Sequence, residues 1–245
     1  MGEPQRAMVD ALGLIPTTSA RGNAATRADF LWRVERFGPE TAEWWATRDA
    51  ETAARESRER AEKREMTLRR IAAFRLPITA RDVALIADSK LDATKLRERV
   101  AAWFGSGNDA KPWSVLCGPV GRGKTLTVAE VLVRAGGRYV GARELERLSM
   151  AKFGEDQSAF QALLDTRGLL VIDDLGREDD AGRMQSALLD VVDYRRGIGH
   201  RTAAITNFAK KGFVERYPDE RLQSRLAECA EWIVDVGPDM RRSKS

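Results

Sequence analysis

Histidine and cysteine are scarce in this sequence of 245 residues, and no long apolar run occurs in it. The single histidine, His200, excludes a histidine cluster for metal binding or a catalytic triad. The two cysteines, Cys117 and Cys229, lack the spacing of a metal site, and we expect both to be reduced thiols. No stretch approaches the roughly 20 apolar residues of a membrane span, and Met1–Asp10 lacks the pattern of a signal peptide. The sequence therefore predicts a cytoplasmic protein that does not act in a membrane.

Charged residues are numerous but balanced. The chain is 43% hydrophobic and 32% charged, and its formal net charge is +4 at pH 7. The mild positive charge permits contact with nucleic acid but does not argue for it, because arginine and glutamate are interleaved over most of the length. The length fits one large domain, or one domain with a smaller appendage.

A glycine-rich stretch at Gly118–Thr125 carries the strongest chemical signal. Its sequence G-P-V-G-R-G-K-T matches the P-loop pattern G-x-x-x-x-G-K-T, in which backbone N–H groups wrap nucleotide phosphates. The apolar run Trp113–Cys117 before it predicts a buried strand, and the apolar spacing over 126–133 predicts a helix that ends at Gly136 and Gly137. Because strand, glycine loop and helix follow in the order that the pattern requires, we expect a nucleotide-phosphate site here.

The residues of the P-loop have distinct expected roles. Lys124 would reach the β and γ phosphates, and the Thr125 hydroxyl would bind Mg²⁺. The expected phosphate contacts are the loop residues and the first residue beyond them: Gly118, Pro119, Val120, Gly121, Arg122, Gly123, Lys124, Thr125 and Leu126. The loop therefore predicts a bound nucleotide with Mg²⁺.

Two acidic residues follow a second apolar run. Leu169–Ile172 is apolar throughout, as expected of a parallel strand covered on both faces, and Asp173 and Asp174 come directly after it. There Asp173 can hold Mg²⁺, directly or through water, and Asp174 can polarise the water that attacks the γ-phosphate. A further strand over 202–206 is followed by Asn207, which could orient the same water. These residues predict a hydrolytic site beside the P-loop.

Strands and helices alternate from residue 113 onward. Beyond the segments above, strands are expected at 138–140 and 232–234, and helices at 142–150, 156–165, 181–194 and 219–229. This alternation predicts an α/β sandwich with a mostly parallel central sheet, whose ligands lie at the carboxyl ends of the strands.

Residues 40–75 differ from the rest in composition. They contain no glycine or proline and are rich in Ala, Glu and Arg, so they predict one long, mostly solvated helix. Shorter helices are expected before it within 1–38, and after it at 79–88 and 93–104.

A domain boundary is expected near Pro77, which breaks the long helix. It separates an all-α domain over 1–76 from a nucleotide-binding domain over 77–245. Trp44 and Trp45 lie near the start of the long helix. They could anchor a protein partner, since tryptophan is enriched at interface hot spots, or they could pack against the preceding helices.

Together these motifs resemble those of the AAA+ superfamily. Within it they are similar to the bacterial replicative helicase loaders of the DnaC and DnaI type and to the related IstB transposition helper ATPases. The resemblance covers roughly residues 105–242 and rests on these segments: Gly118–Thr125, Val171–Gly176, Asp193–Arg196, Thr202–Asn207, Glu220–Leu226 and Gly237–Arg241. It implies the three-layer P-loop fold of AAA+ ATPases, preceded by the all-α domain.

The resemblance also implies roles for single residues. Asp174 would be the catalytic acid and Asn207 the sensor of the γ-phosphate. Arg225 would be the arginine finger that acts across a subunit interface, with Arg221 as the alternative finger. Arg241 would contact the nucleotide as a second, C-terminal sensor. A site completed by a neighbour implies that ATP and Mg²⁺ are bound between protomers, which self-associate into an open oligomer.

Single-stranded DNA is the nucleic-acid partner that the resemblance implies. In this clade it is bound near the helices after the second strand, which corresponds to residues 143–160 here. The candidates for phosphate contact and base stacking are Arg143, Arg147, Lys152 and Phe153. Acidic residues lie among them and cancel their charge: Glu144, Glu146, Glu155 and Asp156.

Three functions remain open at this point. The first is an ATP-dependent loader of the hexameric replicative DNA helicase, which residues 1–76 would grip and which hydrolysis through Asp174 and Arg225 would release. The second is an IstB-like ATPase that delivers target DNA to a transposase. The third is a nucleotide-dependent adaptor with little turnover, whose long helix is the functional surface. A small-molecule P-loop kinase is disfavoured, because no arginine-rich lid insert follows the nucleotide motifs.

Overall fold

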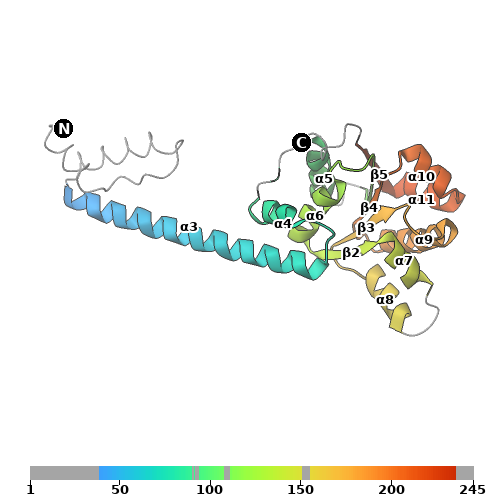
Figure 1. Ribbon diagram of the computed structural model, residues 1–245, viewed down its shortest axis with the longest axis horizontal. Helices are drawn as coiled ribbons and strands as arrows, with labels where there is room; N and C mark the ends of the chain where they lie inside the picture. Colours follow the sequence, from blue (N-terminus) through green and yellow to red (C-terminus); the bar gives the residue numbers. More distant parts are fainter. Residues whose placement is uncertain (1–38, 90, 92–93, 108–110, 151–154, 236–245) are drawn as a thin grey trace. The chain divides into compact units, whose positions relative to one another are not determined.

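The computed structural model describes residues 39–89, 91, 94–107, 111–150 and 155–235 (Figure 1). The chain divides into two compact units, Met1–Lys63 and Arg64–Ser245. The boundary expected near Pro77 stays a prediction. The helices expected within 1–38, and the side chains of Trp44 and Trp45, lie outside the described part. Among the helices that are described, none has the length and apolar character needed to cross a membrane.

Helix α3 runs without a break from Pro39 to Phe74, which confirms the long helix expected over 40–75. Proline suits the first position of a helix, because the N–H that it lacks would have no partner there. Every side chain from 47 to 66 is exposed, as a solvated helix requires. Glu56 and Arg60, one turn apart on this helix, form an ion pair at 3.1 Å.

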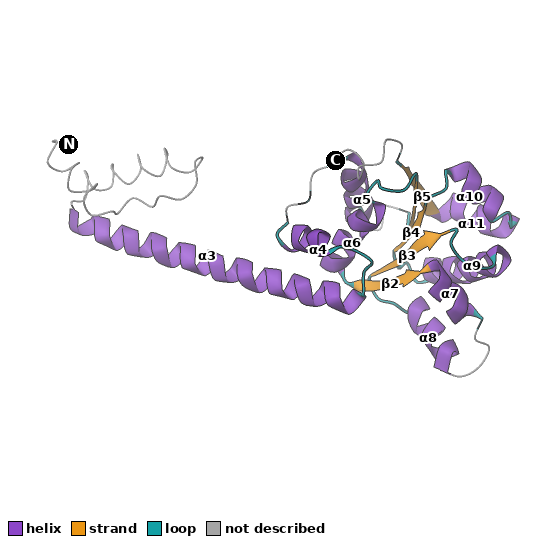
Figure 2. Cartoon of the chain, viewed as in Figure 1, coloured by secondary structure: helices purple, strands orange, loops and turns teal. Residues whose placement is uncertain are grey.

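In the described part of the chain the sheet has five parallel strands in the order β2-β3-β4-β1-β5 (Figure 2). The strands are β1 (Trp113–Cys117), β2 (Gly137–Gly141), β3 (Leu169–Leu175), β4 (Thr202–Thr206) and β5 (Ala230–Val234). Each contains a run that the sequence predicted as a strand. Because all strands run in one direction, their carboxyl ends meet at one edge of the sheet.

Helices cover both faces of this sheet. They are α4 (Ala80–Ala87), α5 (Lys95–Gly105), α6 (Lys124–Ala135), α7 (Ala142–Ser149), α8 (Glu155–Leu164), α9 (Ala181–Gly197), α10 (Lys210–Arg216) and α11 (Glu220–Cys229). Leu169 and Val171 of β3 pack with α5 and α6, whereas Leu170 and Ile172 pack with α7 to α11. The alternation of β3 side chains between the two cores confirms the three-layer α/β sandwich.

Helix α10 was not expected from the sequence. It begins with Lys210, Lys211 and Gly212, and Phe213 is its one buried residue. A helix with so little apolar periodicity gives no signal that distinguishes it from a loop. Thr79 caps the start of α4, since its side chain accepts a hydrogen bond from the backbone N–H of Asp82.

A buried arginine, Arg195 of α9, fastens the amino ends of β3 and β4. Its side chain is fully buried, and its guanidinium donates hydrogen bonds of 2.8–3.2 Å to the Thr202 hydroxyl and to the carbonyls of Leu164, Thr166, Gly168 and Arg201. Burial lowers the pKa of this guanidinium to about 10, so it remains charged at neutral pH. One side chain therefore ties together the segments that lead into two neighbouring strands.

The last turns of α3, within the second unit, pack against α6. Ile71 is buried in a cluster with Ile86, Ala129 and Val133. The Arg70 guanidinium donates to the Val133 carbonyl at 3.0 Å, near the end of α6. Cations at this position complement the helix dipole and satisfy carbonyls that lack helical partners. The end of α3 is thus a structural part of the second unit.

Candidate nucleotide-binding site

The P-loop connects β1 to α6 at the carboxyl edge of the sheet. Helix α6 begins at Lys124, and Gly123 is its N-cap residue. Gly121 (φ 80°) and Gly123 (φ 78°) both adopt left-handed backbone, which glycine does without strain. The first N–H groups of α6 lack helical acceptors and lie at the positive end of the helix dipole. The loop and helix together have the geometry of an anion site.

The remaining loop residues differ in exposure. Pro119 and Val120 are exposed, and Val120 is 48% exposed. Leu126, which we expected to contact phosphate, instead packs its side chain with Ile71 and Val133. Any contact of Leu126 with a phosphate would therefore come from its backbone.

Lys124 lies folded within the loop that it belongs to. Its side chain is 5% exposed, and its Nζ donates hydrogen bonds to the Gly118 carbonyl at 2.7 Å and the Pro119 carbonyl at 2.8 Å. A third bond runs to Asn207 Oδ1, just beyond β4, at 3.0 Å. Burial lowers the pKa of Lys124, while the carboxylates of Asp173 and Asp235 oppose this shift. The structure thus brings two of the predicted site residues, Lys124 and Asn207, into direct contact.

Asp173 points inward from β3 toward the first turn of α6. It is 2% exposed, and its Oδ2 accepts hydrogen bonds from the Thr125 hydroxyl at 2.8 Å and the Tyr139 hydroxyl at 3.1 Å. Its Oδ1 accepts the Asp174 backbone N–H at 2.7 Å. Burial raises the pKa of Asp173, while the bonds from Thr125 and the Asp174 N–H oppose the rise.

Thr125 and Asp173 fit a Mg²⁺ ion. A hydroxyl and a carboxylate oxygen, 2.8 Å apart, are the hard oxygen ligands that this ion prefers. No group of three or more His, Cys, Asp or Glu side chains suited to a metal occurs in the described ranges. A Mg²⁺ ion held by Thr125 and Asp173 would therefore keep water and phosphate oxygens as its other ligands, which is its usual behaviour in nucleotide sites.

Asp174 points the other way and is open to solvent. Its side chain is 51% exposed, and its backbone is left-handed (φ 59°), a conformation that aspartate tolerates better than most residues. The pairing of β3 with β4 shifts register between Ile172 and Leu175. Bulges of this kind re-aim side chains beside active sites. At this irregularity the two consecutive acids have different surroundings. The Asp173 side chain is buried, and the Asp174 side chain is exposed.

The loop after β3 is held by two buried carboxylates. Glu146 of α7, which is 3% exposed, accepts the N–H groups of Asp179 and Asp180 at 2.9 and 3.0 Å. Glu178 accepts the Gly176 N–H at 2.7 Å and the Arg216 guanidinium at 2.9 Å. We expected Glu146 to offset nearby positive charge on the surface. This was wrong, because its carboxylate is buried and accepts hydrogen bonds from backbone N–H groups.

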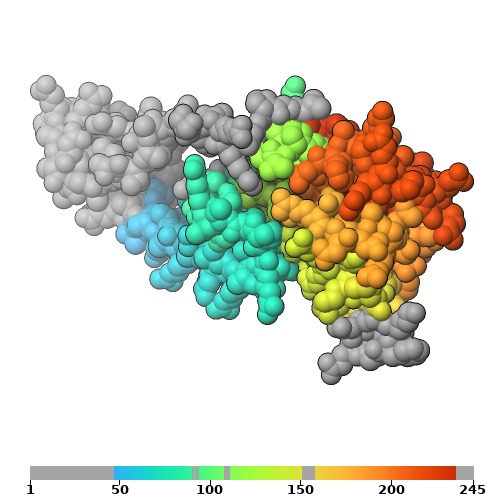
Figure 3. Space-filling view, turned by 45° about the vertical axis from the view of Figure 1, so that its right-hand side comes forward, coloured from blue at the N-terminus to red at the C-terminus, as the bar shows by residue number. Residues whose placement is uncertain are grey.

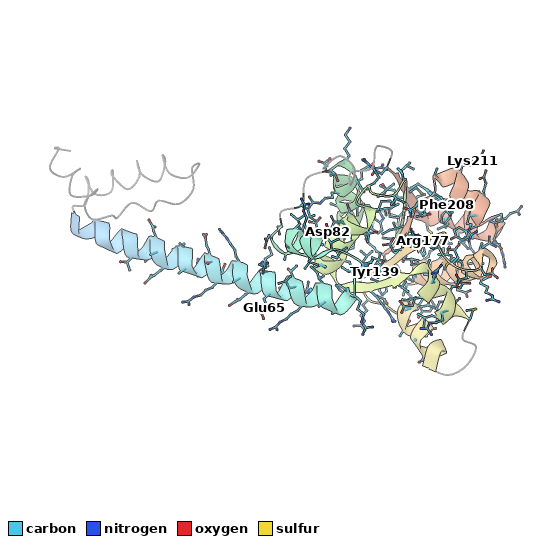
Figure 4. The ribbon with its side chains drawn as sticks, viewed as in Figure 1. Glu65, Asp82, Tyr139, Arg177, Phe208 and Lys211 are labelled. Atoms are coloured by element: carbon cyan, nitrogen blue, oxygen red, sulfur yellow. The ribbon has the colours of Figure 1, made fainter. Side chains whose placement is uncertain are left out.

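A hollow opens where β2 and β3 end. It is lined by Gly141, Ala142, Arg143, Asp174 and Arg177. The Arg143 guanidinium donates to the Arg177 carbonyl at 2.9 Å, and Arg177 lies 3.8 Å from the Asp174 carboxylate. Figure 4 labels Arg177 near this edge of the sheet and Tyr139 on β2. The hollow therefore adjoins the exposed acid.

Neither Tyr139 nor Asp235 was among the predicted site residues. Tyr139 binds Asp173 from the neighbouring strand β2. Asp235 follows β5, beside β1, and forms an ion pair with Arg122 of the P-loop at 2.9 Å. Asp235 does carry a usable signal, since an acid directly after an apolar strand is the feature that identified Asp173.

The two candidate fingers lie on α11, which packs beside α9. In the space-filling view, the orange and red residues, which include both helices, lie next to one another (Figure 3). Arg225 pairs with Asp193 of α9 at 2.9 Å, and Arg221 with the N-cap residue Asp219 at 3.3 Å. Within the described residues no hydrogen bond or ion pair joins either arginine to the P-loop. The structure thus does not bring them to Lys124 of the same chain.

Three of the predicted site residues lie outside the described part of the chain: Arg241, Lys152 and Phe153. Arg143 and Arg147 are exposed on α7. Arg143 is also 3.5 Å from the Asp179 carboxylate.

Comparison with known proteins places the fold. No protein-family model matches the chain, and no curated protein gives a significant match. Among solved structures, the DnaC helicase loader superposes with a TM-score of 0.50 at 19% identity, covering 64% of this chain and 100% of that one. DnaI superposes with a TM-score of 0.50 at 20% identity, covering 60% of this chain and 88% of that one. The chain therefore shares the fold of the DnaC and DnaI structures.

Proposed function

We propose that this chain is an ATPase that loads the replicative DNA helicase. One observation carries the ATPase proposal. Two side-chain hydrogen bonds join residues of separate elements at this edge: Lys124 bonds to Asn207 at 3.0 Å, and Thr125 bonds to Asp173 at 2.8 Å. No packing requirement explains why a lysine, an amide, a hydroxyl and an acid should meet at this edge. A lysine, a hydroxyl and a carboxylate are the groups that hold triphosphate and Mg²⁺ in P-loop proteins, and an amide can orient the attacking water.

The proposed hydrolysis uses the residues in distinct roles. ATP phosphates take the place of the Gly118 and Pro119 carbonyls as partners of Lys124. Asn207 and Asp174 position a water molecule, and Asp174 accepts its proton as the water oxygen bonds to the γ-phosphorus. The bond from the γ-phosphorus to the bridging oxygen breaks, which leaves ADP and phosphate. Bound Mg²⁺ would supply charge neutralisation to the phosphates from Thr125 and Asp173.

Self-association completes the proposed site. Arg225 would leave Asp193 and act on the γ-phosphate of ATP in a neighbouring protomer, with Arg221 as the alternative. Arg225 is 45% exposed in its ion pair, so the exchange of partners costs little. ATP would then join protomers into an open oligomer, and hydrolysis would release them. Arg241 would contact the nucleotide as a second sensor.

The proposed partners are the hexameric helicase and single-stranded DNA. The helicase would bind the all-α domain over 1–76, and the ATPase domain would span 77–245. The fold shared with the DnaC helicase loader over 64% of this chain supports the loader proposal as a whole. Arg143 and Arg147 are exposed as a DNA contact requires. The buried free thiols Cys117 and Cys229 suit a reducing compartment such as the cytoplasm.

A pull-down with the intact chain tests the loader proposal. We expect the purified hexameric helicase from the same genome to be retained with ATP, and to be lost when Trp44 and Trp45 are both changed to alanine. Arg55→Ala, on the exposed part of α3, is the control. Failure to retain the helicase under any nucleotide condition contradicts the proposal. An ATP-dependent preference for duplex over single-stranded DNA would instead favour the IstB-like function, and helicase binding without turnover would favour the adaptor.

A further inference from the structure

Arg122 of the P-loop is tied to the carboxyl end of β5. Its Nε and Nη2 donate hydrogen bonds to the two carboxylate oxygens of Asp235 at 2.9 and 3.0 Å. The side chains are 17% and 15% exposed. A bidentate pair that is largely removed from water fixes both direction and distance, as a single lysine contact would not.

The same residue also contacts the start of the loop. The Asp235 N–H donates to the Cys117 carbonyl at 2.9 Å, which extends the β1–β5 ladder by one bond. Its carbonyl oxygen lies so near Gly118 that a Cβ there would come within 2.1 Å. Asp235 therefore binds Cys117 through its backbone N–H and Arg122 through its side chain, and its carbonyl packs closely against Gly118.

A loop of this composition needs such a restraint. Glycines at 118, 121 and 123 leave the backbone with many accessible conformations, and each residue ordered on binding costs about 1–2 kcal/mol in conformational entropy. A loop already held in its binding conformation loses less entropy when phosphate arrives. Arg122 lies between Gly121 and Gly123, where an anchored side chain restricts the loop most.

Simple electrostatics predicts the opposite role for Asp235. Its carboxylate is close enough to act on the Lys124 ammonium, so its negative charge would also repel a triphosphate. If charge dominated, removing Asp235 would strengthen nucleotide binding. If restraint dominates, removing it weakens binding. The two accounts differ in sign, and this makes the role of Asp235 testable.

We propose that Asp235 is a positioning residue for nucleotide binding, which acts by holding the P-loop through Arg122. The inference rests on the proposed binding of ATP by Lys124. Arg122 restrains the loop backbone from the side, and the phosphates are bound by the N–H groups and Lys124.

A double-mutant cycle on the full-length protein measures this directly. The affinity for a fluorescent ATP analogue is determined for Asp235→Ala, Arg122→Ala and the double variant. We expect each single change to weaken binding about three- to tenfold, and the double variant to bind no more weakly than the weaker single variant. Tighter binding by Asp235→Ala, or additive losses, would overturn the proposal.

Matched controls separate restraint from general damage. Arg64 and Asp88 form another arginine–aspartate pair, at 2.7 Å on α3 and α4, and the same cycle there should leave affinity unchanged. Arg122→Lys keeps the positive charge but loses the bidentate guanidinium contact. Its affinity for the ATP analogue should therefore be as low as that of Arg122→Ala, while its melting temperature stays that of the unmutated protein. If Asp235→Ala fails to fold, Asp235→Asn replaces it in the cycle, with the same expected sign. If the unmutated chain does not bind ATP, or if Lys124→Ala binds as well, the proposed function fails instead.

Discussion

Lys124 and Asn207 are joined by a hydrogen bond of 3.0 Å from Nζ to Oδ1, which links the first residue of α6 to the end of β4. The two residues are far apart in sequence and meet because β4 lies next to β1 in the sheet. A phosphate that binds Lys124 therefore arrives beside the Asn207 amide. If the loop binds ATP as proposed, Asn207 is placed to respond to the bound phosphate.

Lys124→Ala should abolish ATP binding. It removes a buried ammonium that can bond the phosphates, and a charged hydrogen bond contributes about 1.5–3 kcal/mol, with several made at once. Equilibrium binding of a fluorescent ATP analogue measures the loss. Lys211→Ala, a change of an exposed lysine on α10, is the control. Equal affinity of the Lys124 and Lys211 variants would contradict the role of the P-loop.

Asp174→Asn should keep ATP binding and lose hydrolysis. The amide fills the same space but cannot take a proton from water, and a general base contributes about 10²–10⁴ to a rate. Phosphate release under saturating ATP is the measurement. Asp179→Asn makes the same change in a nearby, 80% exposed acid that pairs with Arg143, and should hydrolyse normally. Normal turnover by Asp174→Asn would remove this residue from the chemistry.

Arg225→Ala should bind ATP and fail to hydrolyse it in the assembled state. A finger that acts on a neighbour contributes about 10³–10⁵ to the rate. Arg221→Ala, one turn away on α11, decides which arginine is the finger. Asp193→Ala removes the partner of Arg225 within the protomer, and we expect it to leave hydrolysis intact or raised.

Mixing two inactive variants tests action between subunits. Arg225→Ala supplies an intact P-loop, and Lys124→Ala supplies an intact arginine, so a mixed assembly contains complete sites. Hydrolysis should therefore reappear when the two are combined. A mixture as inactive as its components would mean that Arg225 does not act across an interface.

Arg195→Met should destabilise the fold by about 3–5 kcal/mol. It leaves the carbonyls of Leu164, Thr166 and Gly168 without the Arg195 guanidinium as donor, and the Arg201 carbonyl with the Leu170 N–H alone. Urea unfolding measures the free energy. Arg183→Met, on the exposed face of the same helix, should change it by no more than about 0.5 kcal/mol. Similar stabilities would show that the Arg195 bonds are dispensable.

The strands were predictable because β1, β3 and β4 each contain a mostly apolar run, a pattern that local sequence shows directly. Asp173 and Asp174 were identified for the same reason, since they end such a run. Helix α10 was not predicted, because Phe213 is its one buried residue.

Local sequence patterns did not identify the residues whose contacts depend on the order of the strands in the sheet. Tyr139 meets Asp173 because β2 lies beside β3, and Asp235 meets Arg122 because β5 lies beside β1. A linear sequence does not state which strands are neighbours. Glu146 was misjudged for a related reason, since its burial depends on where the loop after β3 folds back.

The buried guanidinium of Arg195 stabilises the sheet at its amino edge. There Arg195 binds the segments before β3 and β4. The side chains proposed for ATP chemistry lie at the opposite edge. Substitutions of exposed polar groups at the carboxyl edge, Asp174 among them, should therefore yield folded, soluble protein. The chemistry of this chain can then be changed independently of its foldability, which makes it a tractable scaffold for redesign.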